Sequence, residues 1–205
     1  MPNANMLELE ACLEDAILFC QEHSDDHYSQ LYFDRLVRAR SRWLDSIETS
    51  DQVHIKWRTE ERQELIAFKQ LATALRDVQR EMRRTGVIDF PAMKVMYWDE
   101  AILLAAVERM CEFLRDHTDD IDFAAEYVEK FERLVDSARA GDKEVESSIH
   151  EYQRFIHVRR EATNEVIALI GEMRTAMRRG LGKKNELYKS IRWPYSIASD
   201  DNVLF

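Results

Sequence analysis

Apolar residues recur every three or four positions along most of the chain, and this spacing predicts helices because it places side chains on one face. One face of a first helix is formed by Met6, Leu9, Leu13, Ala16 and Cys20. A second helix is expected from near Asp26 to residues 48–51, where Thr, Ser and Asp side chains favour a helix end. A third is expected from about Gln52 to Thr85, followed by Gly86.

A second set of three helices is expected after a connector at residues 87–95. The first of them ends near Asp116 and is the most apolar segment of the chain, so we expect it to be the most buried. The next one follows residues 117–120 and stops or bends at Gly141. The last one ends near Gly180.

The two sets of helices are similar in sequence. A shift of 94 places residues 13–26 on residues 107–120, with five identities among 14 positions, where composition alone predicts about one. A shift of 95 continues the match and places Tyr32 on Tyr127. These matches predict an internal duplication.

The pattern therefore predicts an all-α protein, an elongated helical bundle of two tandem three-helix units with coiled-coil-like packing. We expect the first unit at residues 1–86, the second at 87–182 and a docked aromatic tail at 183–205. A single continuous bundle around the helix that ends at Asp116 is the competing architecture. Only five glycines and three prolines occur in 205 residues, which argues against a β-sandwich or a glycine-punctuated α/β enzyme.

The charge balance limits the kind of partner. The chain carries 29 Lys and Arg against 39 Asp and Glu, a formal net charge of −10. Such a field repels phosphates, so it argues against nucleic acid and favours another protein with a basic surface. The longest apolar run, residues 101–107, is far shorter than the roughly 20 residues that span a bilayer, so no membrane segment is expected.

The termini and cysteines indicate the compartment. The first ten residues lack the basic and apolar regions of a signal peptide. Cys12, Cys20 and Cys111 are odd in number, lie in apolar patterns and lack a metal-type spacing, so we expect reduced core thiols. These features predict a cytoplasmic protein.

Carboxylates and imidazoles meet at both helix junctions, and these groups suit zinc, iron or manganese. The candidate ligands are His23, His27, His117 and Asp120. The set is incomplete because no Glu-x-x-His motif of a di-iron bundle occurs, and helix capping explains the same residues. No Ser or Cys lies in a glycine-rich turn and no phosphate-binding loop is present, so we expect no catalytic site, metal or cofactor.

Partner-binding residues are expected in the tail and at polar positions of the helix seams. Aromatic side chains and a proline in the tail resemble the anchors of interfaces, although the tail could equally pack on its own bundle. Polar seam positions indicate either a helix that leaves the core or a groove for a partner. The predicted binding residues are Trp193, Pro194, Tyr195, Leu204, Phe205, Arg40 and Arg159.

The sequence therefore favours a non-catalytic helical protein–protein interaction module: an adaptor, a chaperone-like subunit, an inhibitor or a structural subunit of an assembly. The partner is expected to be another protein, and a second copy of the chain is a further candidate. The alternative is a carboxylate- and histidine-based, metal-dependent enzyme built on a helical bundle.

Overall fold

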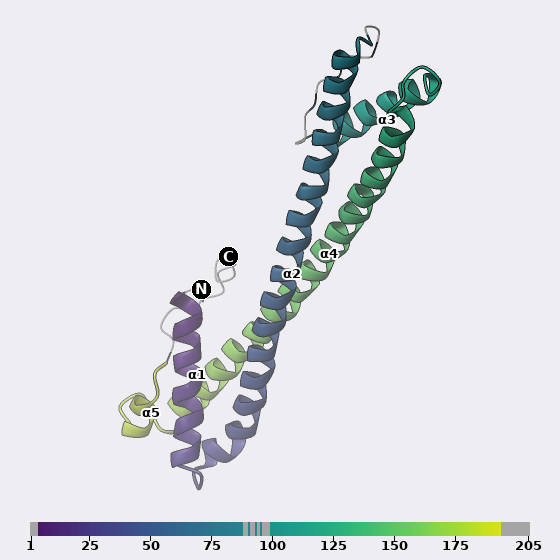
Figure 1. Cartoon of the computed structure of the whole chain (residues 1–205). Coiled ribbons are helices and arrows are strands. Elements are labelled where there is room, and N and C mark those ends of the chain that lie inside the picture. Colours follow the sequence, from purple (N-terminus) through teal and green to yellow (C-terminus); the bar gives the residue numbers. More distant parts are fainter. Residues whose placement is uncertain (1–3, 88–89, 91–92, 94, 96–98, 194–205) are drawn as a thin grey trace. The chain divides into compact units, whose positions relative to one another are not determined.

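The structure is a computed structural model, and it describes residues 4–87, 90, 93, 95 and 99–193. All regular structure in these residues is helical, which confirms the prediction of an all-α helical bundle. The five helices are α1 (Ala4–Glu22), α2 (His27–Thr85), α3 (Glu100–Asp116), α4 (Ala124–Gly180) and α5 (Glu186–Ser190), as shown in Figure 1.

Helix α2 is continuous for 59 residues, so the helix end predicted at residues 48–51 is wrong. The Thr49 hydroxyl donates to the carbonyl oxygen of Asp45 at 2.8 Å, and the Ser50 hydroxyl donates to that of Ile47 at 3.0 Å. These hydroxyls bond back into the turn before them, a bond that polar side chains can also make inside a helix. Cap-forming residues therefore do not end this helix.

Helix α4 is also continuous, so the stop predicted at Gly141 as one of two outcomes, a stop or a bend, is wrong. A Cβ atom at Gly141 would lie 3.4 Å from the Cα atom of Glu64 on α2. The glycine is therefore a place where the backbones of two helices approach closely, not the end of one.

The remaining predicted ends agree with the structure. Residues 23–26 separate α1 from α2, and the Asp26 carboxylate accepts the backbone N–H of Tyr28 at 2.8 Å, as a capping residue does. Gly86 follows α2 with a φ of +80°, and Gly182 follows α4 with a φ of +85°. Both adopt the left-handed conformation that glycine accepts without steric cost.

The chain forms two compact units, which we call unit 1 and unit 2. Unit 1 contains Met1–Val53 and Tyr152–Phe205, and unit 2 contains His54–Glu151. The predicted boundaries at residues 86 and 182 do not coincide with these units, because α2 and α4 each continue from one unit into the other. Each unit therefore combines residues from both predicted repeats.

The core of unit 1 is built by α1, the first part of α2 and the last part of α4. Helices α2 and α4 run antiparallel there, since Arg35 pairs with Glu172 and Arg42 pairs with Glu165. The core of unit 2 is built by the last part of α2, by α3 and by the first part of α4. Its fully buried side chains include Leu71, Leu75, Met82, Leu103, Met110, Leu114 and Phe131.

The pattern of burial repeats along the chain at the shifts found in the sequence. Leu9, Leu13 and Ala16 of α1 are buried, and so are Leu103, Val107 and Met110 of α3, 94 residues later. In the same way, α2 buries Leu71, Leu75, Val78 and Met82, and α4 buries Val166, Ile170, Met173 and Met177, 95 residues later. The helix lengths also repeat, with 19 and 59 residues in one pair and 17 and 57 in the other. This agreement supports the predicted duplication.

Candidate functional site

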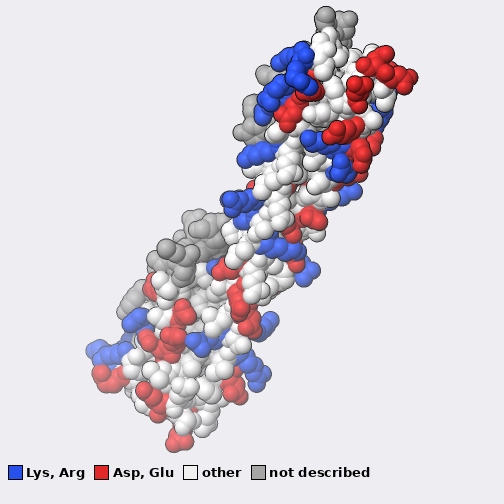
Figure 2. Space-filling view, in the orientation of Figure 1, with Lys and Arg blue, Asp and Glu red and all other residues white. Residues whose placement is uncertain are grey.

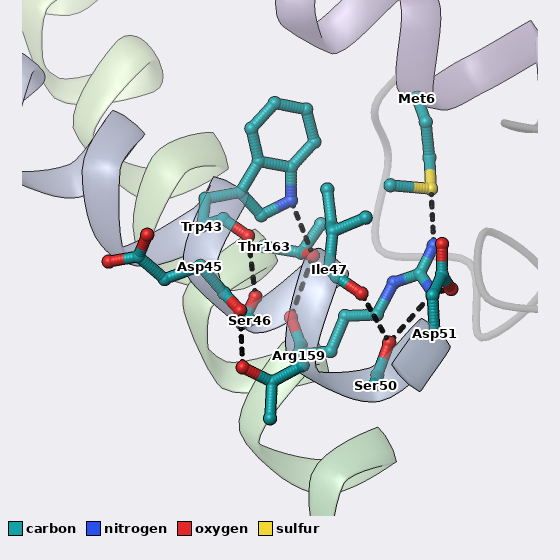
Figure 3. A network of polar contacts seen from close by, with 10 residues as sticks. Met6, Trp43, Asp45, Ser46, Ile47, Ser50, Asp51, Arg159 and Thr163 are labelled. Atoms are coloured by element: carbon teal, nitrogen blue, oxygen red, sulfur yellow. Dashed lines mark hydrogen bonds and ion pairs between the residues drawn. The ribbon is translucent and has the colours of Figure 1, made fainter. Parts of the chain in front are cut away.

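Arg159, a predicted partner-binding residue, lies in a polar network inside unit 1 (Figure 3). Its guanidinium donates to the Ser50 hydroxyl at 3.1 Å, lies 3.4 Å from the Asp51 carboxylate and contacts the Met6 sulfur at 3.0 Å. The side chain is only 24% exposed. Arg159 of α4 therefore reaches both α1 and α2 within the chain.

The same network contains a buried tryptophan. The Trp43 indole N–H donates to the Thr163 hydroxyl at 3.0 Å, and that hydroxyl donates to the carbonyl oxygen of Arg159 at 2.8 Å. Arg40, the other predicted arginine, pairs with Glu14 of α1 at 3.0 Å on the surface. These polar seam residues join helices of unit 1.

The described part of the tail docks on its own chain. Tyr188, Ile191 and Trp193 are buried in the core of unit 1. The Trp193 indole N–H donates to the carbonyl oxygen of Tyr188 at 2.8 Å, and the two rings stack 5.4 Å apart. The other predicted tail residues, namely Pro194, Tyr195, Leu204 and Phe205, lie outside the described residues.

The four predicted metal ligands lie in different surroundings. His23 packs against Phe19 with ring centroids 4.8 Å apart, and His117 stacks on Phe113 at 4.3 Å. His23 and His27 belong to unit 1, and His117 and Asp120 belong to unit 2. In the part of the chain that the structure describes, none of the four belongs to a cluster of three potential ligands.

A cluster that the sequence did not reveal brings three carboxylates together in unit 2. Oxygen atoms of Glu64 on α2, Glu100 on α3 and Asp142 on α4 lie within 4.8 Å of one another, a spacing compatible with a metal ion. Burial and the two neighbouring charges raise the pKa of Glu64, and burial and Asp142 raise the pKa of Glu100. The cluster depends on the close approach at Gly141, which the sequence pattern alone does not show.

The cysteine thiols are buried and unpaired, as predicted. Burial raises the pKa of Cys20 and of Cys111 to about 11, and it also raises the pKa of Cys12. The thiols are therefore protonated at neutral pH, and a protonated thiol is a poor nucleophile.

An open groove runs between α2 and α4 in unit 2, and we call it the α2/α4 groove. Its volume is about 420 Å³. It is lined by Ile66, Lys69, Gln70, Thr73, Ala74, Asp77, Lys130 and Leu134. These residues belong to α2 and α4 alone, so α3 does not cover the groove.

The equivalent positions of unit 1 are closed by an ion pair. The Arg35 guanidinium donates to both oxygens of Glu172, at 3.0 and 2.7 Å, and the Tyr32 hydroxyl also lies 3.4 Å from Glu172. The 95-residue shift places Arg35 on Lys130, and it places Asp77 on Glu172. No ion pair links Lys130 to Asp77, both of which lie among the described residues.

Two residues that line the α2/α4 groove carry larger apolar side chains than their counterparts in the other repeat. Ile66 is 47% exposed, and the equivalent position in the other repeat is Glu161. Leu134 takes the position equivalent to Ala39. The two repeats share a core pattern but differ at these positions, where the described residues of unit 2 line a groove and Arg35 pairs with Glu172 in unit 1.

No protein-family model, no curated protein and no solved structure matches the chain. Within the described residues, no helix combines the length and the apolar character needed to cross a bilayer. The function must therefore be inferred from the surfaces of the chain itself.

Proposed function

We propose that the protein is a non-catalytic helical interaction module whose α2/α4 groove receives an amphipathic helix of a partner protein. The observation that carries the proposal is the difference between the repeats. Unit 2 exposes an apolar groove where unit 1 closes the same positions with the bidentate pair of Arg35 and Glu172. An exposed apolar groove costs free energy unless another surface covers it.

A helix fits the groove because two packed helices form a furrow into which a third can lay its apolar side chains. Ile66, Ala74 and Leu134 provide apolar contacts. Lys130 on α4 and Asp77 on α2 place opposite charges on the two sides of the groove. We expect a partner helix with apolar residues at every third or fourth position. A carboxylate beside Lys130 and a basic residue beside Asp77 would complete the contact.

The first test locates the partner on the surface of the full chain. A photo-crosslinking amino acid is placed at Thr73 in the groove or at Arg76, which is exposed on the same helix but does not line the groove. After irradiation in an extract of the native cell, a partner protein should be crosslinked to the variant with the photo-crosslinking residue at Thr73 but not to the variant with it at Arg76. Equal attachment at both positions would contradict the groove as the contact surface.

The second test measures the affinity of the chain for the purified partner that the crosslinking experiment identifies. The double variant Ile66→Glu with Leu134→Glu should bind at least about tenfold more weakly, because charges would enter an apolar contact. Val158→Glu is the matched control, since Val158 is an exposed apolar residue of α4 in unit 1. Circular dichroism verifies that both variants are folded. Unchanged affinity of the groove variant would refute the proposal.

The alternative function, a metal-dependent enzyme, would have to use Glu64, Glu100 and Asp142 rather than the predicted histidines. Manganese that raised the melting temperature of the wild type but not of Glu64→Gln would favour this alternative. A cytoplasmic location belongs to the interaction proposal and rests on the composition of the sequence.

A further inference from the structure

A basic surface lies at the end of α4 in unit 1, and we call it the basic end. It consists of Arg178, Arg179, Lys183 and Lys184, all exposed. Gly182, with its φ of +85°, turns the chain so that the two lysines follow directly after the last turn of the helix. None of the four side chains makes an ion pair with another described residue.

The equivalent end of α2 is neutralised within the chain. Arg84 pairs with Glu81, Arg80 pairs with Asp77, and Arg83 lies over the Phe90 ring. The 95-residue shift places Glu81 on Ala176, so the basic end has lost this internal carboxylate. Cations favour a helix C-terminus, but that effect acts equally on both ends and does not explain the difference.

An acidic surface lies at the turn between α3 and α4 in unit 2, and we call it the acidic turn. It consists of Asp116, Asp119, Asp120, Asp122 and Glu126, all exposed. Figure 2 shows acidic side chains gathered where Figure 1 places this turn. None of the five carboxylates pairs with a cation among the described residues, although surface ion pairs occur elsewhere in unit 2.

We propose that the basic end of one copy of the chain docks on the acidic turn of a second copy. The two surfaces have opposite charge, and each lacks a partner within the described chain. Because the surfaces differ, the contact is heterologous. It goes beyond the α2/α4 groove and uses none of the groove residues. Since the contact is mainly electrostatic, salt at physiological strength or above weakens it.

Sedimentation velocity of the full chain tests the contact. In about 20 mM salt the sedimentation coefficient should rise with protein concentration, and in about 300 mM salt the rise should be lost because screening is stronger. A chain that stays monomeric in low salt at all concentrations would overturn the proposal.

Charge reversal tests which surfaces meet. Arg178→Glu with Arg179→Glu cancels the net positive charge of the basic end, and Asp119→Lys with Asp120→Lys removes most of the net negative charge of the acidic turn. Neither variant then keeps both charged surfaces, so neither should self-associate. An equal mixture of the two variants should associate, because the intact acidic turn of the first variant can meet the intact basic end of the second. Self-association of either variant, or a mixture that stays monomeric, would overturn the assignment.

A control separates this contact from a general effect of net charge. Arg38→Glu with Arg109→Glu changes the net charge as much as the variant of the basic end, and both arginines are exposed and lie outside the two surfaces. This control should associate like the wild type. Loss of association in the control would show that net charge, and not the basic end, governs self-association and would refute the proposal.

Discussion

The hydroxyl of Thr163 acts as both acceptor and donor in the core of unit 1. It accepts the indole N–H of Trp43 on α2 and donates to the backbone of its own helix, α4. Trp43 is 1% exposed, so water could not take the place of the Thr163 hydroxyl as the acceptor of its indole N–H. A single buried hydroxyl therefore links the two long helices inside the core of this unit.

Thr163→Val should lower the free energy of unfolding by about 1–3 kcal/mol, because the variant leaves the buried indole N–H without an acceptor. Urea unfolding measures the change. Thr163→Ser keeps the hydroxyl and serves as the control, with a smaller loss. In Trp43→Phe the donor is absent, so adding Thr163→Val should then cost less than in the wild type. Equal costs in both backgrounds would show that the hydrogen bond contributes nothing.

The carboxylate cluster of unit 2 predicts a pH dependence. A raised pKa in the folded state means that ionised Glu64 opposes folding at neutral pH, and this cost is lost as the pH falls below the unfolded-state pKa. Glu64→Gln should therefore stabilise the protein at pH 7, by up to about 1 kcal/mol for such a partly exposed group. The gain should shrink towards pH 4.

Thermal unfolding from pH 4 to pH 7 measures this gain. Glu146→Gln is the control, because Glu146 is exposed on the same helix as Asp142 but does not belong to the cluster. A Glu64→Gln variant that is less stable than the wild type at pH 7 would show that the carboxylate has a favourable partner.

At the scale of the helices, the sequence correctly predicts the helix ends that depend on local backbone conformation. It also predicts interruptions at residues 48–51 and at Gly141, where the helices continue. Gly86 and the turn at residues 23–26 were predicted because their local chemistry ends a helix in any setting. Ser50 and Gly141 have the same local character, yet one bonds back within α2 and the other faces Glu64. Distant residues also contact both positions, Arg159 at Ser50 and Glu64 at Gly141, and no local pattern contains these contacts.

The continuity of α4 makes a prediction at Gly171. A Cβ atom there meets nothing within 4 Å, and the residue lies inside the helix. Gly171→Ala should therefore stabilise the protein by about 0.5–1 kcal/mol, because alanine loses less backbone entropy. Gly141→Leu is the opposite case and should destabilise, since its side chain would meet Glu64. Denaturant unfolding of both variants measures the difference, and a destabilising Gly171→Ala would argue against a continuous helix.

The tail after α4 forms part of the core of unit 1. Trp193→Ala should lower stability by about 3–5 kcal/mol, the usual cost of removing a buried tryptophan. Ending the chain after Gly182 should cost at least as much, because Tyr188 and Ile191 are also lost. Lys184→Ala, at an exposed position, is the control. A truncated chain as stable as the wild type would show that the tail contributes only to association.

At the scale of the whole molecule, both long helices belong to both units. Val53 of unit 1 and His54 of unit 2 are consecutive residues within α2, and the same holds for Glu151 and Tyr152 of α4. Helix formation is cooperative along the backbone. Unfolding of one unit therefore removes the helical turns that adjoin the parts of α2 and α4 in the other unit. We expect the units to unfold together.

Leu75→Ala in unit 2 tests this coupling, because Leu75 is fully buried and its loss should cost about 2–5 kcal/mol. Hydrogen exchange of the full chain should show weaker protection in α1 of unit 1 as well, by at least about tenfold. Protection in α1 that is unchanged would show that the units unfold independently.

The candidate sites could be predicted from the sequence only in part. Arg40 and Arg159 were singled out because they are polar at seam positions, and both do form contacts between helices. The α2/α4 groove itself could not be found, because its two sides belong to α2 and α4 and no local pattern shows that these segments come together. The duplication was visible in the sequence, so the signal that marks the difference between the repeats was present.

The interleaving of the units also bears on how the chain is made. Synthesis proceeds from the N-terminus, and unit 2 is one uninterrupted segment, His54–Glu151, so all of its core residues are present once Glu151 has been added. Residues 4–53 are made before unit 2, but their core is complete only after residues 152–193 have been made as well. During that interval the apolar face of α1, with Leu9, Leu13 and Phe19, stays open to chaperones on the ribosome. Of the two units, the one whose synthesis begins earlier is thus the one whose core is completed later.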